Sequence, residues 1–114
     1  MAYKSQALAI PLMTFASSAL TTSYQAFSPA TLPNAIFCLV ITNGSSTSVT
    51  ISYDGTNDHE YMLSGGTKVI NFATNASPVN YTCLMAQGTG IYVKGTAGTG
   101  QIAISGYYQP VNNQ

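Results

Sequence analysis

The sequence has very little charge. Lys, Arg, Asp and Glu make up 5% of its 114 residues, against about 25% in a typical globular domain, and Arg does not occur. The three lysines balance the three acidic residues, so the formal net charge is zero. Proteins bind nucleic acid largely through Lys and Arg that neutralise phosphates, so we expect no nucleic-acid partner. A neutral surface favours association, which indicates either a surface covered by neighbours or a secreted or cell-surface domain with a neutral exterior.

Long apolar runs are also missing. The longest, Ala35 to Ile41, has the length of a strand and not of the ~20-residue helix that spans a membrane, so we expect no membrane segment. Residues 1–20 faintly imitate a signal peptide, but Pro11 interrupts their apolar stretch. We therefore interpret this segment as a strand and expect the chain to fold in the cytosol.

Groups for catalysis are scarce. The three acidic residues and the only His all lie at positions 54–60, as Asp54, Asp58, His59 and Glu60. Clustered carboxylates can bind Ca²⁺, but this spacing does not match an EF-hand loop, and Asp54-Gly55 is typical of a hairpin turn. Adjacent strand residues point to opposite faces, so Asp58 and His59 do not form an acid–base pair. We expect no enzyme, no cofactor, no metal site and no small-molecule substrate.

The two cysteines, Cys38 and Cys83, lie in apolar, strand-like segments. Because no export signal is evident and free cysteines pack as small hydrophobic residues, we expect two reduced, buried thiols, with a single disulfide as the alternative. The run from Gly95 to Gly100 lacks the Gly-Lys-Ser/Thr ending of a phosphate-binding loop and predicts a hairpin tip.

β-strand patterns cover most of the chain. Short apolar or alternating segments recur about every 8–12 residues between Gly, Pro and Asn turns, which is typical of a sandwich or barrel. Pro29 and Pro33 mark a loop, and Asn43-Gly44 predicts a hairpin turn. Segment 36–41 is continuously apolar and predicts a central strand buried on both faces. The expected strands are 8–15 (an edge strand, because of Pro11), 20–27, 36–41, 49–53, 59–63, 69–72, 81–85, 91–94 and 101–105.

These patterns predict one all-β domain over residues 1–114. We expect an antiparallel β-sandwich of about eight strands, of which the jelly-roll is one form, with short tails at 1–6 and 109–114. Tyr is enriched at interfaces, and one of two adjacent strand residues faces outward, so Tyr107 and Tyr108 after the last strand are candidate interface residues. The alternative is that both tyrosines pack into the core or cover an edge of the sheet. Further interface candidates lie in the N-terminal tail: Tyr3, Lys4 and Gln6.

Parts of the second half resemble small structural proteins of tailed bacteriophages. The first part is Ile51 to His59 (ISYDGTNDH) with Leu63 to Thr67 (LSGGT), and the second is Ile91 to Gly100 (IYVKGTAGTG) with Ile104 to Tyr108 (ISGYY). The resemblance consists of turn and strand patterns and carries over no catalytic residue. It implies a virion component with a β-sandwich fold, most closely a capsid cement (decoration) protein present in several copies around a symmetry axis.

On this resemblance, the expected partners are the major capsid protein and further copies of the chain, in a virion assembled in the host cytoplasm. The family also contains head–tail connector and tail components, which form rings on one axis, whereas a cement protein covers the whole shell. A carbohydrate-binding β-sandwich module is a further alternative, because Tyr-rich sandwiches suit that role, although the absence of Trp counts against it.

Overall fold

The computed structural model describes residues 8–71 and 85–108, and within these ranges the chain is all-β. No helix in the described ranges is long and apolar enough to cross a membrane. The described elements are β1 (Leu8–Ala9), β2 (Met13–Ala16), the 3-10 turn η1 (Ser17–Ala19), β3 (Gln25–Thr31), β4 (Cys38–Asn43), β5 (Val49–Ser52), β6 (Glu60–Met62), β7 (Thr67–Asn71), β8 (Gly90–Gly95) and β9 (Gln101–Tyr108).

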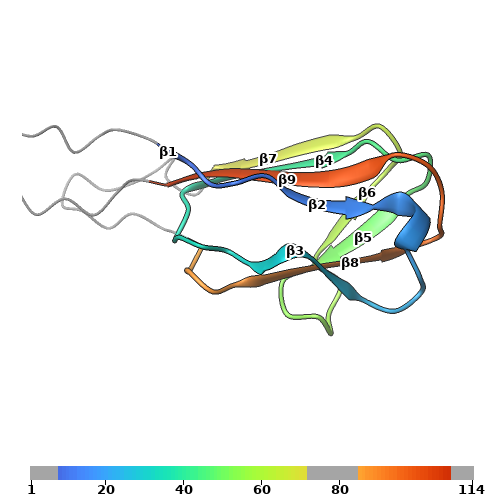
Figure 1. Ribbon diagram of the computed structural model, residues 1–114, viewed down its shortest axis with the longest axis horizontal. Coiled ribbons are helices and arrows are strands. Elements are labelled where there is room, and N and C mark those ends of the chain that lie inside the picture. The colour runs from blue at the N-terminus through green and yellow to red at the C-terminus, as the bar shows by residue number, and fades with distance from the viewer. Residues whose placement is uncertain (1–7, 72–84, 109–114) are drawn as a thin grey trace, which may run out of the picture.

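The strands form one antiparallel sheet that folds back on itself. Its order is β6-β5-β8-β3-β2-β9-β4-β7, and β1 pairs separately with β9. Strands β7, β4, β9 and β2 make one half, which faces the other half, β3, β8, β5 and β6, across the core (Figure 1). The sheet almost closes into a barrel, with β6 and β7 as its two edges. The prediction of an antiparallel all-β fold is therefore confirmed.

The core lies between the two halves and is built largely from alternate residues of strands such as β4, β8 and β9. In β4, Leu39 and Ile41 are fully buried, while Cys38 and Val40, which alternate with them, are only half-buried. The prediction that segment 36–41 is buried on both faces is therefore wrong, because one face of β4 lies on the outside of the molecule. β4 is nevertheless central within its half, between β9 and β7. Other fully buried side chains include Met13, Ile51, Ile91, Val93, Ile102 and Ile104.

An ion pair bridges the seam between the two edge strands. Lys68 of β7 pairs with buried Ile41, and Glu60 of β6 pairs with buried Ile51, so both charged residues face the inner side of the sheet. The Lys68 ammonium forms a salt bridge with the Glu60 carboxylate, which is only 14% exposed. Inward-pointing charged residues on edge strands hinder the addition of a further strand.

The first predicted strand, 8–15, is divided in two. Both β1 and β2 pair with β9, and Pro11 lies in the gap between them. β2 lies between β9 and β3 in the sheet, so the prediction of an edge strand is wrong for this part of the segment, whereas β1 pairs with β9 alone among the described strands. Proline has no N–H for the ladder, and here it interrupts the strand between β1 and β2.

The second predicted strand, 20–27, begins and ends later than expected. β3 starts at Gln25, and Pro29, which predicted a loop, lies inside this strand after a cis peptide bond. The register of β3 against β8 shifts between Ala26 and Thr31. A proline is tolerated in a strand at such an irregularity, because the ladder needs no N–H donor there.

Two predicted hairpins are connections between the halves of the sheet. β4 and β5, joined through Asn43-Gly44, lie in opposite halves and do not pair. The same holds for β8 and β9, which the run Gly95 to Gly100 connects. Both hairpin predictions are wrong, because turn residues indicate a reversal of the chain but not which strand it then pairs with.

A buried polar side chain lies at the centre of these connections. Asn43, at the end of β4, is 0% exposed. Its amide nitrogen donates to the carbonyl oxygens of Thr47 at 2.9 Å and Leu63 at 3.1 Å, and lies 3.3 Å from that of Met62. Its carbonyl oxygen accepts from the Ser45 N–H at 3.1 Å and the Ser45 hydroxyl at 2.6 Å. Asn43 therefore joins the β4–β5 connection to the β6–β7 connection.

The main chain of Asn43 strengthens the same junction. Its N–H donates to the Gly66 carbonyl and its carbonyl accepts from the Gly65 N–H, both at 2.8 Å. The β8–β9 connection joins next to it, since the Ser46 N–H donates to the Thr99 carbonyl at 3.0 Å. The three connections at this end of the molecule thus share one hydrogen-bond network.

Replacement of Asn43 should destabilise the fold strongly. Asn43→Ala removes the side-chain hydrogen bonds to Thr47, Leu63 and Ser45 and leaves a cavity at a fully buried position, so we expect a loss on the order of 3–5 kcal/mol. Urea unfolding measures this loss. The control is Asn34→Ala, in a half-buried loop position, which should change stability by less than ~0.5 kcal/mol. Equal unfolding midpoints for the two variants would contradict this role of Asn43.

A comparison of two glycines distinguishes the cost of an unfavourable backbone conformation from the cost of a steric clash. Gly88 and Gly100 have φ of 87° and 84°, but a Cβ at Gly100 would lie 2.2 Å from the Gly44 carbonyl oxygen, whereas nothing lies within 4 Å of one at Gly88. We expect Gly88→Ala to cost about 1–2 kcal/mol, from backbone conformation alone. Gly100→Ala should cost at least ~2 kcal/mol more in the same unfolding experiment. Similar costs would show that the β8–β9 connection is not tightly packed.

Candidate interaction surfaces

The two C-terminal candidate tyrosines lie inside β9 and not after it. Tyr107 pairs with Cys38 of β4 and is 40% exposed, whereas Tyr108 is half-buried and packs against the core. The expectation that one of the two faces outward is confirmed, and their role in an interface stays a prediction. The other interface candidates lie outside the described residues: Tyr3, Lys4 and Gln6.

The outer side of the half-sheet β7-β4-β9 carries no charged residue among those the structure describes. Val69 of β7 pairs with Val40 of β4, which pairs with Ser105 of β9, so these side chains form one row on the outside. Val69 is 62% exposed. We call this surface the uncharged face, and its residues are Thr67, Val69, Asn71, Cys38, Val40, Thr42, Ala103, Ser105 and Tyr107.

The charged side chains of the described ranges lie elsewhere, at the seam and over the half-sheet β6-β5-β8. Each of them lies within 4.0 Å of a group of opposite or potentially opposite charge. Within the described ranges, one face of the molecule therefore carries charge and one does not. The pairs are Lys68 with Glu60, Lys94 with Asp58, and His59 with Asp54.

Asp54 organises the turn between β5 and β6. Its Oδ1 accepts hydrogen bonds from the N–H groups of Thr56 and Asn57, both at 2.8 Å, and from the Ser52 hydroxyl at 2.9 Å. The side-chain amide of Asn57 donates to Oδ2 at 2.8 Å. These bonds to the ionised form, those from Asn57 foremost, hold the pKa of the Asp54 carboxyl well below its usual range. Gly55 has φ of 81°, so the predicted Asp-Gly turn is confirmed.

The end of this turn is fixed to the face of β8. The Tyr24 hydroxyl donates to Asp58 Oδ1, and Lys94 Nζ lies 3.1 Å from the same oxygen and 4.6 Å from the centroid of the Tyr24 ring. The Tyr24 hydrogen bond, and then Lys94, lower the pKa of Asp58. Desolvation, and then Asp58, raise the pKa of Tyr24 to about 12. In the described ranges, no three His, Cys, Asp or Glu residues are grouped so that they could hold a metal ion.

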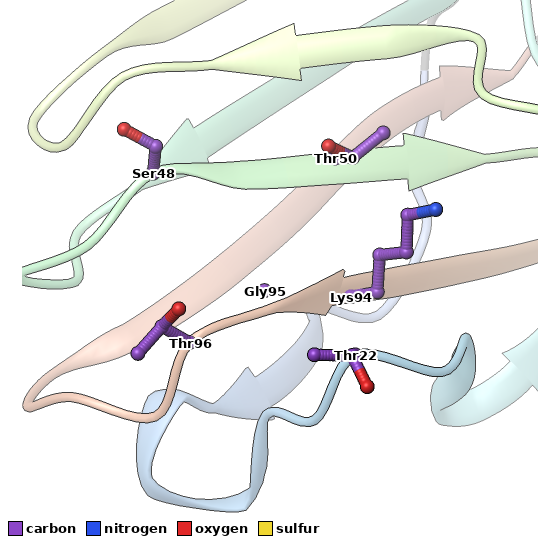
Figure 2. A pocket seen from close by; sticks show the side chains of 6 residues that line it. All are labelled: Thr22, Ser48, Thr50, Lys94, Gly95 and Thr96. Atoms are coloured by element: carbon purple, nitrogen blue, oxygen red, sulfur yellow. The ribbon is translucent and has the colours of Figure 1, made fainter.

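A shallow hollow lies beside this cluster, on the outer side of β5 and β8 (Figure 2). Its volume is about 280 Å³. The lining residues are exposed or half-buried, so the hollow opens to solvent. They are Thr22, Ser48, Thr50, Lys94, Gly95 and Thr96.

Cys38 is a free thiol on the uncharged face, half-buried rather than buried as predicted, because it belongs to the outward-facing set of β4. Cys83 lies outside the described residues.

Three residues of these surfaces were not predicted from the sequence: Tyr24, Lys94 and Val69. The alternation of residues along β7 could have placed Val69 on one face of that strand, but only knowledge of strand pairing could have joined Tyr24 to Lys94.

Comparison with models of known protein families, with curated proteins and with solved structures finds no match to this chain. The surfaces described above are therefore interpreted from their own chemistry.

Acid should destabilise the fold through Asp54 and Asp58. Both carboxyl groups have a lowered pKa in the folded chain, so their contribution is present above the unfolded value of about 4 and is lost as the pH falls through the folded pKa. We expect the urea midpoint to fall steadily between about pH 5 and about pH 2. The fall should be smaller in Asp54→Asn, and an identical pH profile for this variant would contradict the role of Asp54.

Proposed function

We propose that the chain is a structural protein of a tailed-phage virion, and within it a capsid cement protein whose two half-sheets form a β-sandwich. The resemblance of its turn and strand segments to such proteins supports this choice of particle. The chemistry of the uncharged face supports the mode of action, which is coverage of a neighbouring surface without catalysis.

The uncharged face is the observation that carries the proposal. A side chain that becomes buried in an interface loses its water, and this costs free energy for a charged group but is favourable for an apolar one. Val69 and Tyr107 expose apolar area. The side chains of Val40 and Ser105, which lie in one row with Val69, are small and uncharged. Such a face can be covered by another protein with little penalty from desolvation.

The edges of the sheet are less suited to this contact than its face. Lys68 and Glu60 point inward at the two edge strands and form a salt bridge across the seam. A partner that added a strand to β6 or β7 would have to break or bypass this pair. We therefore assign the contact with the major capsid protein, or with a second copy beside it, to the uncharged face.

Many copies of the protein on one shell could together bind stably even if each contact is weak. A cement protein binds at many equivalent positions of a shell, and contacts made by linked copies add through their effective concentration. A neutral chain also places no repulsion between copies that lie close together. The proposed action is thus mechanical: the protein adds buried area at junctions of the shell and opposes the pressure of the packed genome.

A charge placed on the uncharged face should prevent shell binding. Val69→Lys and Leu63→Lys introduce the same charge at positions that are 62% and 65% exposed, but only Val69 lies on this face. Both variants should keep the stability of the parent within ~0.5 kcal/mol. We expect Val69→Lys to bind shells of the major capsid protein at least roughly tenfold more weakly in co-sedimentation, and Leu63→Lys to bind like the parent. Equal binding of both variants would exclude the uncharged face as the contact.

The number of copies in purified particles tests the assignment to the shell. A cement protein should be present on the order of hundreds per particle, because it covers the whole surface. Quantitative mass spectrometry of virions measures this number. About a dozen copies or fewer would favour a connector or tail ring instead, and absence from the particle would contradict any virion role.

A further inference from the structure

The shallow hollow on the charged side of the molecule contains unused hydrogen-bonding groups. Four hydroxyls line it, and within the described ranges none of them forms a hydrogen bond in the protein. Nearby hydroxyls behave differently: that of Thr47 donates to the Thr96 carbonyl at 2.8 Å, and that of Thr21 to the Ser23 carbonyl at 3.1 Å. The four free hydroxyls belong to Thr22, Ser48, Thr50 and Thr96.

The hollow is held in place by backbone and side-chain contacts. The Gly95 N–H donates to the Thr21 carbonyl at 2.8 Å, which fixes the segment that carries Thr22 against β8. Lys94 is fixed by Asp58 at 3.1 Å and by the Tyr24 ring. The backbone that carries Thr22 and the side chain of Lys94 therefore need little reorganisation to bind a ligand, which lowers the cost of binding.

An exposed aromatic residue lies on the strand next to the hollow. Thr50 pairs with Lys94 on one side and with Tyr61 of β6 on the other, so the three side chains form one row on the outside of the sheet. Paired residues have Cβ atoms about 5 Å apart, which places Tyr61 directly beside Thr50. Tyr61 is 66% exposed, and its phenol has no hydrogen-bond partner in the described ranges.

We propose that this hollow binds a neutral saccharide, with the ring of Tyr61 against one face of a sugar and the four free hydroxyls and the Lys94 ammonium bound to sugar hydroxyls. Hydroxyl groups both donate and accept hydrogen bonds, so they match a ligand with many hydroxyls of its own. An aromatic ring supplies apolar area for the C–H face of a sugar ring.

Size and charge limit the ligand further. The volume of about 280 Å³ is close to the lower end of ligand pockets, near ~300 Å³, and fits one or two sugar rings of a longer chain that runs through the open ends. The charge of Lys94 is balanced by Asp58 at 3.1 Å, so an acidic sugar would have to displace this carboxylate. A neutral saccharide keeps the ion pair and uses the remaining donors of the ammonium.

A glycan array of the full chain tests the proposal. The probes are immobilised hexasaccharides of glucose, mannose, xylose and galactose, together with polygalacturonate and heparin fragments as acidic probes. We expect binding to at least one neutral probe. Loss of the phenol ring in Tyr61→Ala and of one hydroxyl in Thr50→Val should weaken it, by roughly tenfold for Tyr61→Ala. Absence of binding to every neutral probe would overturn the proposal.

The same two substitutions, made on the uncharged face, show whether a loss of binding is specific to the hollow. Tyr107→Ala removes a tyrosine and Thr42→Val a threonine hydroxyl from an exposed position, and both should leave glycan binding unchanged. Thr50→Val keeps the β-branched shape and removes a hydroxyl with no internal partner, so its fold should be intact. Equal loss of binding in Tyr107→Ala and Tyr61→Ala would place the ligand elsewhere and overturn the proposal.

The ion pair gives a test of specificity. Asp58→Asn leaves the charge of Lys94 without its carboxylate partner, so this variant should bind the acidic probes more strongly than the parent does. Preference of the parent for acidic probes would contradict the neutral ligand.

Saccharide binding and shell binding can be tested independently. Val69→Lys should bind glycans normally, and Tyr61→Ala should bind shells normally, so each proposal can fail alone.

Discussion

The hydrogen bonds of the buried Asn43 amide are the constraint on which the rest of the fold depends. The chain crosses between the two half-sheets at most of its connections, and the pairing of strands distant in sequence is costly in chain entropy. Asn43 links the β4–β5 and β6–β7 connections within one side chain, and the β8–β9 connection joins beside it. Its burial is tolerated because both ends of the amide are hydrogen-bonded.

Because this junction and the core hold the two halves together, the outer faces are free to differ. One face, which carries Val69 and Tyr107, has no charge among the residues that the structure describes, and the other carries Lys94, Asp58 and the hydroxyl-lined hollow. A chain with only six charged residues can leave a whole face uncharged while every described charge has a partner. We interpret this division as one face for assembly and one for a ligand.

Strand positions were the part of the fold that the sequence could predict, because alternation and turn residues are local signals. In the segment Val49 to Tyr53, Val49 and Ile51 are buried as their alternation predicts, although Ser52 is buried as well. The pairing of strands could not be predicted from these local signals. Asn43-Gly44 has the sequence of a hairpin turn, yet the strands on either side of it do not pair, and the buried Asn43 side chain joins two connections. The hollow was missed for the same reason, since Thr22, Thr50 and Lys94 meet only through the pairing of strands.

The central claim is that the uncharged face is covered in the assembled particle and the hollow is not. Hydroxyl-radical footprinting of the chain, free and bound to shells, compares both faces in one experiment through two exposed tyrosines, Tyr107 and Tyr61. The account predicts that Tyr107 is protected from oxidation on binding while Tyr61 stays as reactive as in the free chain. Protection of Tyr61 with Tyr107 unchanged would contradict it.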